Sequence, residues 1–211
     1  GQLTAAVAAT LGSTCVTNAA VRSLGRDGDA FVAECEHATY RAGRLVVAVP
    51  PAGAAALLGP LDAELGGLLA SIPMAPMAVV HMGHTRRAEQ VPDGFGFLVP
   101  RGEGIRTLGV LFPSRLFEGR APPGGDLFTA YVGGMLDRTA LDLTDRELAG
   151  IAGSDLETLT GFGAEPDLVR VARYPAAIPQ FTLGHLDRMA AIHERRRRLG
   201  GLELAGNYLR G

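Results

Sequence analysis

The sequence contains no lysine and only two cysteines, and it has no apolar run long enough to cross a membrane. All 20 of its Lys and Arg positions are Arg, which we read as a coding bias and not as a functional signal. The net charge is −2, so the charge balance predicts no nucleic-acid partner. Cys15 and Cys35 lie in or beside apolar runs with no secretory signal before them, which predicts two buried free thiols.

The apolar runs are short and interrupted. The longest, residues 45–52 and 72–80, have the length of strands and are broken by Pro, whereas a membrane-spanning helix needs about 20 apolar residues. The sequence therefore predicts a cytoplasmic protein that is at most peripheral to a membrane. Hydrophobic residues make up 47% of the chain and charged residues 20%, which is typical of a globular protein with a packed core.

Motifs for several kinds of chemistry are also missing. His81 and His84 are three residues apart on an expected strand, so they point to opposite faces and we predict no metal site. No Gly-x-Ser-x-Gly elbow is present for a serine nucleophile. The glycines at 94–96 and 161–163 lack the third glycine of a dinucleotide fingerprint. The acidic residues at 142–147 suit a helix start, where the helix dipole favours anions, and predict no catalytic carboxylate pair.

The segments that are present alternate between helical and extended patterns. Apolar periodicity and end signals predict helices over residues 3–11, 54–69 with a break at Pro60, 144–159 and 184–199. Apolar and β-branched runs predict strands over residues 14–24, 30–36, 45–49, 77–84, 95–99, 107–112, 127–132, 168–174 and 202–205. The continuous run 45–49 predicts a strand that is buried on both faces. Thr144 and Glu147 have capping-box spacing, and Arg195 to Arg198 suit a solvated helix end.

The order of these segments indicates two interleaved domains in an α+β or mixed α/β fold. The strands between 95 and 132 predict an antiparallel meander, and the strand at 202–205 returns to the first sheet. One pattern indicates a flat apolar pocket, lined by Phe95, Phe97, Leu98, Leu116 and Phe117. Gly96 and Gly109 would let a planar ligand approach the backbone. From the residues alone, an ordinary core explains this pattern equally well.

Several stretches resemble the protoporphyrinogen oxidase family of flavin enzymes in their order and spacing. They are 94–101 (GFGFLVPR), 108–122 (LGVLFPSRLFEGRAP), 131–134 (YVGG), and 174–185 (YPAAIPQFTLGH) followed by 206–211 (GNYLRG). The resemblance implies an FAD-dependent oxidase that converts protoporphyrinogen IX to protoporphyrin IX in haem or chlorophyll biosynthesis. It leaves the catalytic residues unknown, because the cofactor carries the hydride chemistry and the protein mainly supplies orientation and an apolar slot.

The resemblance also assigns residues to the two ligands. The residues that it places along the tetrapyrrole pocket are Phe95, Gly96, Leu98 and Phe117. The residues that it places against the flavin are Val21, Tyr174, Asn207, Tyr208 and Gly211. Tyr174 stands where the family usually has Trp, near the isoalloxazine ring.

The resemblance divides the chain into three segments. Residues 1–52 and 166–211 match part of an FAD-binding domain without its Rossmann βαβ unit, and residues 53–165 match the substrate-binding domain, an antiparallel sheet with helices. The family's pyrophosphate loop and the helix beyond position 211 are not in the sequence. Because that loop supplies much of the grip on FAD, we expect a fragment that binds FAD weakly or not at all and is inactive alone.

Alternatives stay open at this point. Oxidation of coproporphyrinogen III would need cationic partners for extra carboxylates, and Arg101, Arg106 and Arg115 lie near the pocket motifs. A non-catalytic tetrapyrrole-binding module and another amine-oxidase-like flavoprotein, such as a desaturase, are further alternatives. A homodimer, membrane contact through segments outside this sequence, and the electron acceptor are also left open.

Overall fold

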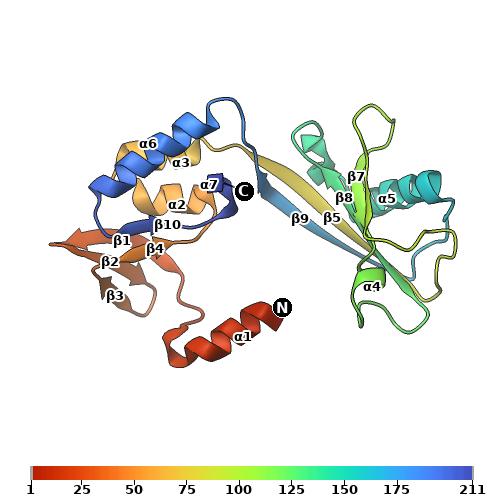
Figure 1. The fold of residues 1–211 in the computed structure, drawn as a ribbon, viewed down its shortest axis with the longest axis horizontal. Helices are drawn as coiled ribbons and strands as arrows, with labels where there is room; N and C mark the ends of the chain where they lie inside the picture. The colour runs from red at the N-terminus through yellow and green to blue at the C-terminus, as the bar shows by residue number, and fades with distance from the viewer. Residues whose placement is uncertain (1, 211) are drawn as a thin grey trace. The chain divides into compact units, whose positions relative to one another are not determined.

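The computed structural model describes residues 2–210, and Figure 1 shows their helices and strands. The chain forms two compact units: unit 1 is Gly1–Ile72 with Phe181–Gly211, and unit 2 is Pro73–Gln180. The interleaving of two parts is therefore present, but the boundaries lie at 72/73 and 180/181. The boundaries expected at 52/53 and 165/166 fall earlier in the chain.

The packing of the helices and of one strand explains this difference. Helices α2 (Pro51–Leu58) and α3 (Ala63–Ala70) share a buried cluster with α6 (His185–Arg198), so they belong to unit 1. Strand β9 (Leu168–Pro179) pairs with β5 (Met74–His84) along most of its length, so it belongs to unit 2. The assignment of either unit to a flavin or a substrate domain stays a prediction.

Unit 1 combines two small sheets with helices. Strands β1 (Val21–Asp27), β2 (Ala30–Cys35) and β3 (Thr39–Ala42) form an antiparallel sheet in that order, and β4 (Leu45–Val47) pairs in parallel with β10 (Leu202–Leu204). The remaining elements are α1 (Gln2–Leu11), the short 3-10 helix η1 (Gly12–Thr14) and α7 (Asn207–Arg210). Among residues 2–210, every helix is too short or too polar to cross a bilayer.

Three expectations about unit 1 are wrong. The first strand begins at Val21 and not at position 14, because η1 and an irregular segment occupy the residues before it. Strand β4 is not buried on both faces: Val46 is 62% exposed, because β4 lies in a sheet of only two strands. Cys15 is exposed and Cys35 is half-buried, although both are free thiols as predicted.

The arginine run at the end of α6 does more than cap the helix. The side chain of Arg195 pairs with Asp62 at 2.8 Å, at the start of α3. The Arg196 side chain is 18% exposed and pairs with Glu203 on β10. The predicted solvated helix end therefore describes Arg197 and Arg198, which pair with Glu194 on the surface of α6.

Unit 2 is built on one antiparallel sheet of five strands, in the order β6-β7-β8-β5-β9. Its other elements are β6 (Gly96–Leu98), β7 (Thr107–Leu111), α4 (Pro113–Leu116), β8 (Asp126–Gly133), η2 (Arg138–Asp142) and α5 (Asp145–Thr160). The meander expected between 95 and 132 is confirmed as β6, β7 and β8, and so is the mixed α/β fold with an antiparallel sheet. The Thr144 and Glu147 capping box is also present.

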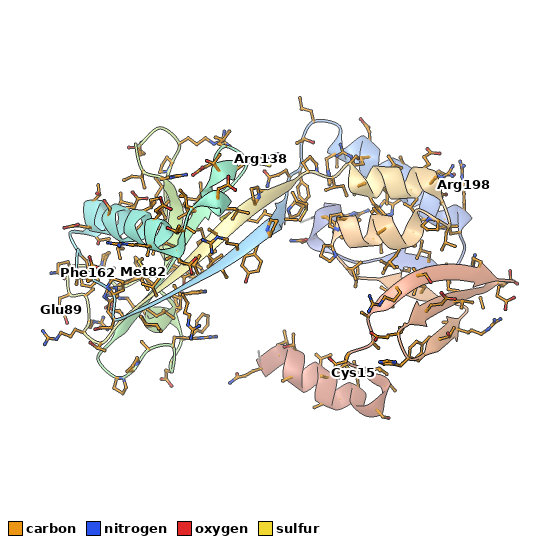
Figure 2. The ribbon with its side chains drawn as sticks, turned by 180° about the vertical axis from the view of Figure 1, so that it is seen from behind. Cys15, Met82, Glu89, Arg138, Phe162 and Arg198 are labelled. Atoms are coloured by element: carbon orange, nitrogen blue, oxygen red, sulfur yellow. The ribbon has the colours of Figure 1, made fainter. Side chains whose placement is uncertain are left out.

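The two faces of this sheet differ. On one face, Ala78, Val80 and Met82 of β5 pack against buried residues of α5, which are Leu148, Ala152 and Leu156. Figure 2 shows Met82 and Phe162, both members of this cluster, in the same part of unit 2. Side chains alternate along a strand, so the intervening residues point to the other face. We call that second surface the open face, because Leu98 is 85% exposed there and Tyr174 is 51% exposed.

Candidate functional site

The open face is defined by the register of the strands. Residues that are paired across neighbouring strands point to the same side of a sheet. One row therefore runs from β7 to β9 through Gly109, Tyr131, Val79 and Ala172, and Leu98 of β6 joins it opposite Gly109. This row is apolar apart from the phenol hydroxyl of Tyr131, and we call it the apolar row.

A second, more polar row lies one step along the strands. Its members are paired in the order Leu111, Thr129, His81 and Arg170, and Gly96 of β6 joins it opposite Leu111. The Nδ1 atom of His81 lies 3.0 Å from the Thr129 hydroxyl oxygen. This contact confirms that both side chains occupy the same face. The open face thus combines an apolar row with an adjacent row that carries hydrogen-bonding and cationic groups.

The structure brings together only some of the predicted substrate residues. Gly96 and Leu98 lie on β6 and belong to the open face. Phe95 precedes β6 and Phe117 follows α4, and both side chains are exposed at 65% and 60%. These two residues flank the sheet instead of lying in either row. A role in substrate binding stays a prediction for all four residues.

The residues that sequence reasoning missed are Leu111, Tyr131 and His81. The motif at 131–134 includes Tyr131, and its neighbour Val132 is fully buried against α5. Simple alternation therefore indicates that Tyr131 faces the opposite way. The alternation of Tyr131 and Val132 can be read from the sequence. It does not tell which residues of the neighbouring strands lie beside Tyr131. The pairing of Tyr131 with Val79 and Gly109 supplies this information.

A cavity of about 450 Å³ lies beside β6 and is bordered by Gly96, Leu98, Phe97, Phe112 and Leu159. The ring of Phe97, which was expected to line a flat pocket, packs edge-on against Phe112 with 5.9 Å between ring centroids. Phe97 lies against the α5-side core. For this residue the ordinary core explanation holds.

Gly96 and Gly109 are required by the strands themselves. Gly96 has φ +137°, and a Cβ atom there would lie 2.1 Å from the carbonyl oxygen of Val110. A Cβ atom on Gly109 would lie 2.6 Å from the carbonyl oxygen of Phe97. Because both collisions involve the neighbouring strand, the close approach of β6 and β7 explains these glycines. The expected approach of a planar ligand is not needed to account for them.

The segment 112–115 of the resemblance forms a buried ion-pair network. Arg115 donates to both carboxylate oxygens of Asp126, at 2.8 Å and 3.2 Å. Ser114 Oγ donates to Asp126 at 3.0 Å and accepts from the N–H of Leu127 at 2.9 Å. The N–H of Ala88 donates to Asp126 at 2.8 Å. This network joins α4, the start of β8 and the loop after β5, so its role is to fix these segments.

Hydrogen bonding keeps Asp126 ionised in this buried position. Burial opposes ionisation, but the hydrogen bonds from Arg115, the Ala88 N–H and Ser114 outweigh it, so the pKa of Asp126 is lowered. The guanidinium of Arg115 is fully engaged by this carboxylate and by the carbonyl oxygens of Ala88 and Val91. Arg115 is therefore not free to bind a substrate carboxylate.

The other two arginines near the pocket motifs differ from each other. Arg106 makes a two-pronged pair with Asp137, at 2.6 Å and 3.0 Å, and the hydrogen bond to Asp137 raises the pKa of Arg106. Arg101 is exposed and makes no ion pair with any residue between 2 and 210. Of the three arginines considered for extra substrate carboxylates, only Arg101 remains uncommitted.

The residues predicted to contact flavin are divided between the units. Val21 begins β1, and Asn207 and Tyr208 begin α7, all in unit 1. Tyr174 lies on β9 in unit 2. Gly211 lies outside the described residues. Contact with flavin stays a prediction for each of them.

Tyr208 has a packing role in unit 1. Its side chain is 1% exposed within the core that α2, α3 and α6 share, and burial raises the pKa of its phenol. Its hydroxyl has no hydrogen-bond partner among the described residues. The ring therefore does not present a face to a ligand.

His81 and His84 lie on opposite faces of the sheet. His84 is buried on the α5 side of the sheet and packs edge-on against Phe162, with 4.9 Å between ring centroids. Desolvation by burial lowers the pKa of His84. His81 lies on the open face, as their spacing predicted. Over residues 2–210, no group of three or more His, Cys, Asp or Glu side chains is arranged to hold a metal ion.

This two-unit fold, with an antiparallel sheet covered by a helix on one face, is the fold of a class of flavin-dependent oxidases. Cyclohexylamine oxidase from Brevibacterium oxydans superposes with a TM-score of 0.73 at 17% identity, covering 99% of this chain and 47% of that one. At this identity the likeness concerns the fold alone. The chain belongs to the family described as flavin containing amine oxidoreductase, whose family model matches residues 1–211.

Relatives in sequence carry names from tetrapyrrole biosynthesis. Protoporphyrinogen oxidase 1 of Spinacia oleracea, a chloroplastic protein, is 36% identical over 184 residues, which are 82% of this chain and 33% of that protein. Coproporphyrinogen III oxidase of Bacillus subtilis is 27% identical, over 82% of this chain and 37% of that protein. The chain thus spans about a third of the length of these relatives. The family resemblance found in the sequence is confirmed.

Proposed function

We propose that this chain is part of an FAD-dependent oxidase that converts protoporphyrinogen IX to protoporphyrin IX. The observation that carries the proposal is the apolar row, which gathers Leu98, Tyr131 and Val79 on one accessible sheet face. The 36% identity to a chloroplastic protoporphyrinogen oxidase supports the substrate class. The chain supplies an apolar row with hydrogen-bonding groups in the row beside it. Such a surface orients a ligand and needs no acid–base cluster, in agreement with the sequence.

The open face has properties suited to a planar, apolar macrocycle. Gly109 and Ala172 contribute little or no side-chain bulk to the apolar row, whereas Leu98 at its β6 end and Tyr131 at its middle carry large side chains. Burial of apolar area is the main source of affinity for such a ligand. A tetrapyrrole stacked on this row would contact Leu98 and Tyr131 and would exclude water from them.

The described residues fit a flavin only in part. Among residues 2–210, unit 1 has two strand-to-helix junctions: one leads from β10 into α7, which has only four residues, and the other, between β4 and α2, is of the kind that can cradle a diphosphate. Pro50 and Pro51 occupy its helix start, and Pro has no N–H to donate to a phosphate. When bound, a flavin supplies the hydride acceptor. Within unit 1, Val21, Asn207 and Tyr208 are the described residues that we propose for contacts to it, and the assignments of Tyr174 and Gly211 to flavin stay predictions.

We expect the isolated chain to bind FAD weakly. The diphosphate has no donor-rich loop among residues 2–210, so a dissociation constant above about 100 μM is expected, equivalent to less than about 5.5 kcal/mol of binding free energy. A titration of FAD with the chain, followed by flavin fluorescence anisotropy, checks this. Stoichiometric binding at micromolar concentration would contradict it. The same titration with the urea-unfolded chain controls for nonspecific contacts.

We expect Leu98→Ala to weaken binding of protoporphyrin IX by about 5- to 20-fold, since burial of a Leu side chain contributes about 1–2 kcal/mol. Spectroscopic titration of the Soret band against the chain measures the affinity. Leu136→Ala is the matched control, because Leu136 is also an exposed leucine of unit 2 and lies outside both rows. Equal loss in both variants, or no loss in L98A, would remove the open face as the binding surface.

The rival substrate, coproporphyrinogen III, has weaker support in this chain. It needs more cationic partners, and Arg106 and Arg115 are already paired with Asp137 and Asp126. The relative with that name in Bacillus subtilis has the lower identity, 27%. A non-catalytic module, a homodimer and a cytoplasmic, at most membrane-peripheral, location stay predictions. Comparing turnover of both porphyrinogens by the longer enzyme decides between the substrates.

A further inference from the structure

The open face carries one arginine that has no counter-ion. Arg170 lies on β9, is exposed, and makes no hydrogen bond or ion pair with any residue from 2 to 210. The strands of unit 2 contain one other arginine, Arg173, three residues along β9. Arg173 points to the opposite face, where it pairs with Asp145 at 2.6 Å and donates to the carbonyl of Leu143 at 2.5 Å.

The neighbours of Arg170 add a second hydrogen-bonding group and no negative charge. His81 is its register partner on β5, and the Nδ1 atom of His81 is occupied by the Thr129 hydroxyl. When that hydroxyl donates to Nδ1, the neutral ring carries its proton on Nε2 and can donate it outward. Neither row of the open face contains Asp or Glu. A cation without a counter-ion therefore borders an apolar surface.

We propose that Arg170, with His81 beside it, binds a carboxylate of the substrate and fixes the direction in which the macrocycle lies on the apolar row. This inference rests on the proposed function and names a specificity-determining residue for it. A guanidinium binds a carboxylate through two parallel N–H donors, which sets orientation as well as affinity. The ligand class is an apolar ring system that carries an acidic side arm.

The spacing of the two rows gives the distance that the ligand must span between its ring system and its carboxylate. Arg170 and Tyr131 lie on β9 and β8, which are separated by β5. Neighbouring strands are about 4.8 Å apart and successive rows on one face are about 7 Å apart. The carboxylate would therefore sit about 12 Å from the ring of Tyr131. A propionate arm that extends toward β9 from the rim of a macrocycle lying between Leu98 and Val79 meets this requirement.

Comparing protoporphyrin IX with its dimethyl ester tests the inference. The two probes share the ring system, but only the free acid has carboxylates. In Soret titrations of the 211-residue chain, Arg170→Gln should weaken the affinity for the free acid by about 3- to 10-fold, the effect expected from losing a partly exposed ion pair. The affinity for the ester should change by less than about 2-fold. The loss should shrink at high salt, and Arg170→Lys should recover part of it.

Arg86→Gln is the matched control, because it also removes one exposed positive charge from unit 2. If R170Q weakens binding of the acid and of the ester equally, or weakens neither, Arg170 does not bind the carboxylate. The apolar row would then still be the proposed binding surface. If R86Q weakens the acid as much as R170Q, general charge attraction explains the effect and the assignment to Arg170 is wrong. If neither probe binds the unsubstituted chain, both this inference and the proposed function are overturned.

Discussion

Replacing Asp126 with Asn is expected to destabilise unit 2 by about 3–5 kcal/mol, the usual effect of removing one partner from a buried ion pair. The Arg115 and Asp126 side chains are 3% and 1% exposed, so water does not compensate for the lost charge. Urea unfolding followed by far-ultraviolet circular dichroism measures the change. Because the chain has two compact units, two transitions are fitted instead of one, and only one of them should move.

The partner substitution sharpens this expectation. Arg115→Met alone should destabilise unit 2 by a similar amount, because it leaves the carboxylate of Asp126 buried without its cation. The double variant with Asn at 126 and Met at 115 should lose less than the sum of the two single losses, since the remaining groups are both uncharged. Asp93→Asn is the control, because Asp93 is 78% exposed and lies 3.5 Å from Arg115. Additive losses would contradict the pairing.

The pH dependence of stability follows from the same network. The hydrogen bonds that hold Asp126 lower its pKa in the folded chain, despite the opposing effect of burial, below the unfolded value of about 3.9. The stabilisation is therefore fully present above the unfolded pKa and is lost as the pH falls through the folded one. D126N removes this group, so the acid-induced loss should be smaller in the variant than in the unsubstituted chain.

Local signals in the sequence predicted most of the helices and strands. The capping box at Thr144 and the apolar periodicity after it are properties of neighbouring residues, and they predicted α5. One failure is the start of β1, which lies at Val21 and not at position 14, and the other two in unit 1 concern burial. Val46 is exposed although its run is apolar, and the number of strands beside β4 decides this. Cys15 is likewise exposed, because an apolar neighbourhood in the sequence does not determine what packs against it.

The sequence predicted residues of the candidate site only where they lie in a motif of the resemblance. The resemblance pointed to Leu98 through a single stretch on β6. Tyr131, His81 and Arg170 come from three other strands, and only the register brings them to one face. The segment at 112–115 belongs to a motif of the resemblance, yet its arginine holds Asp126. Sequence similarity identifies important positions, but it does not tell whether a residue binds a ligand or stabilises the fold.

The second large effect is expected at Gly96. Replacing it with Ala should detach β6 from β7, because φ +137° is unfavourable for a residue with a Cβ atom and because that atom would lie 2.1 Å from Val110 O and 2.8 Å from Leu111 Cα. Backbone strain of this kind costs about 1–3 kcal/mol, and the collision adds to it. We expect a local loss of at least about 2 kcal/mol, or about 30-fold in hydrogen-exchange protection.

Two amides report this detachment directly. The N–H of Val99 donates to Leu108 O and the N–H of Phe112 donates to Phe95 O, both at 3.0 Å and both between β6 and β7 or their ends. Their exchange rates should rise in G96A, while amides paired between β5 and β8 should keep their protection. This contrast follows because β6 is a short edge strand that can open without the rest of the sheet.

Gly102→Ala separates collision from backbone strain alone. Gly102 has φ +92°, and a Cβ atom there would meet nothing within 4 Å, so we expect a loss of only about 1 kcal/mol and no change at Val99 or Phe112. If G96A keeps both amides protected and still loses protoporphyrin IX, then Gly96 acts on the ligand and not on the strand. If it loses protection together with affinity, the glycine serves the site by holding Leu98 in register with Gly109.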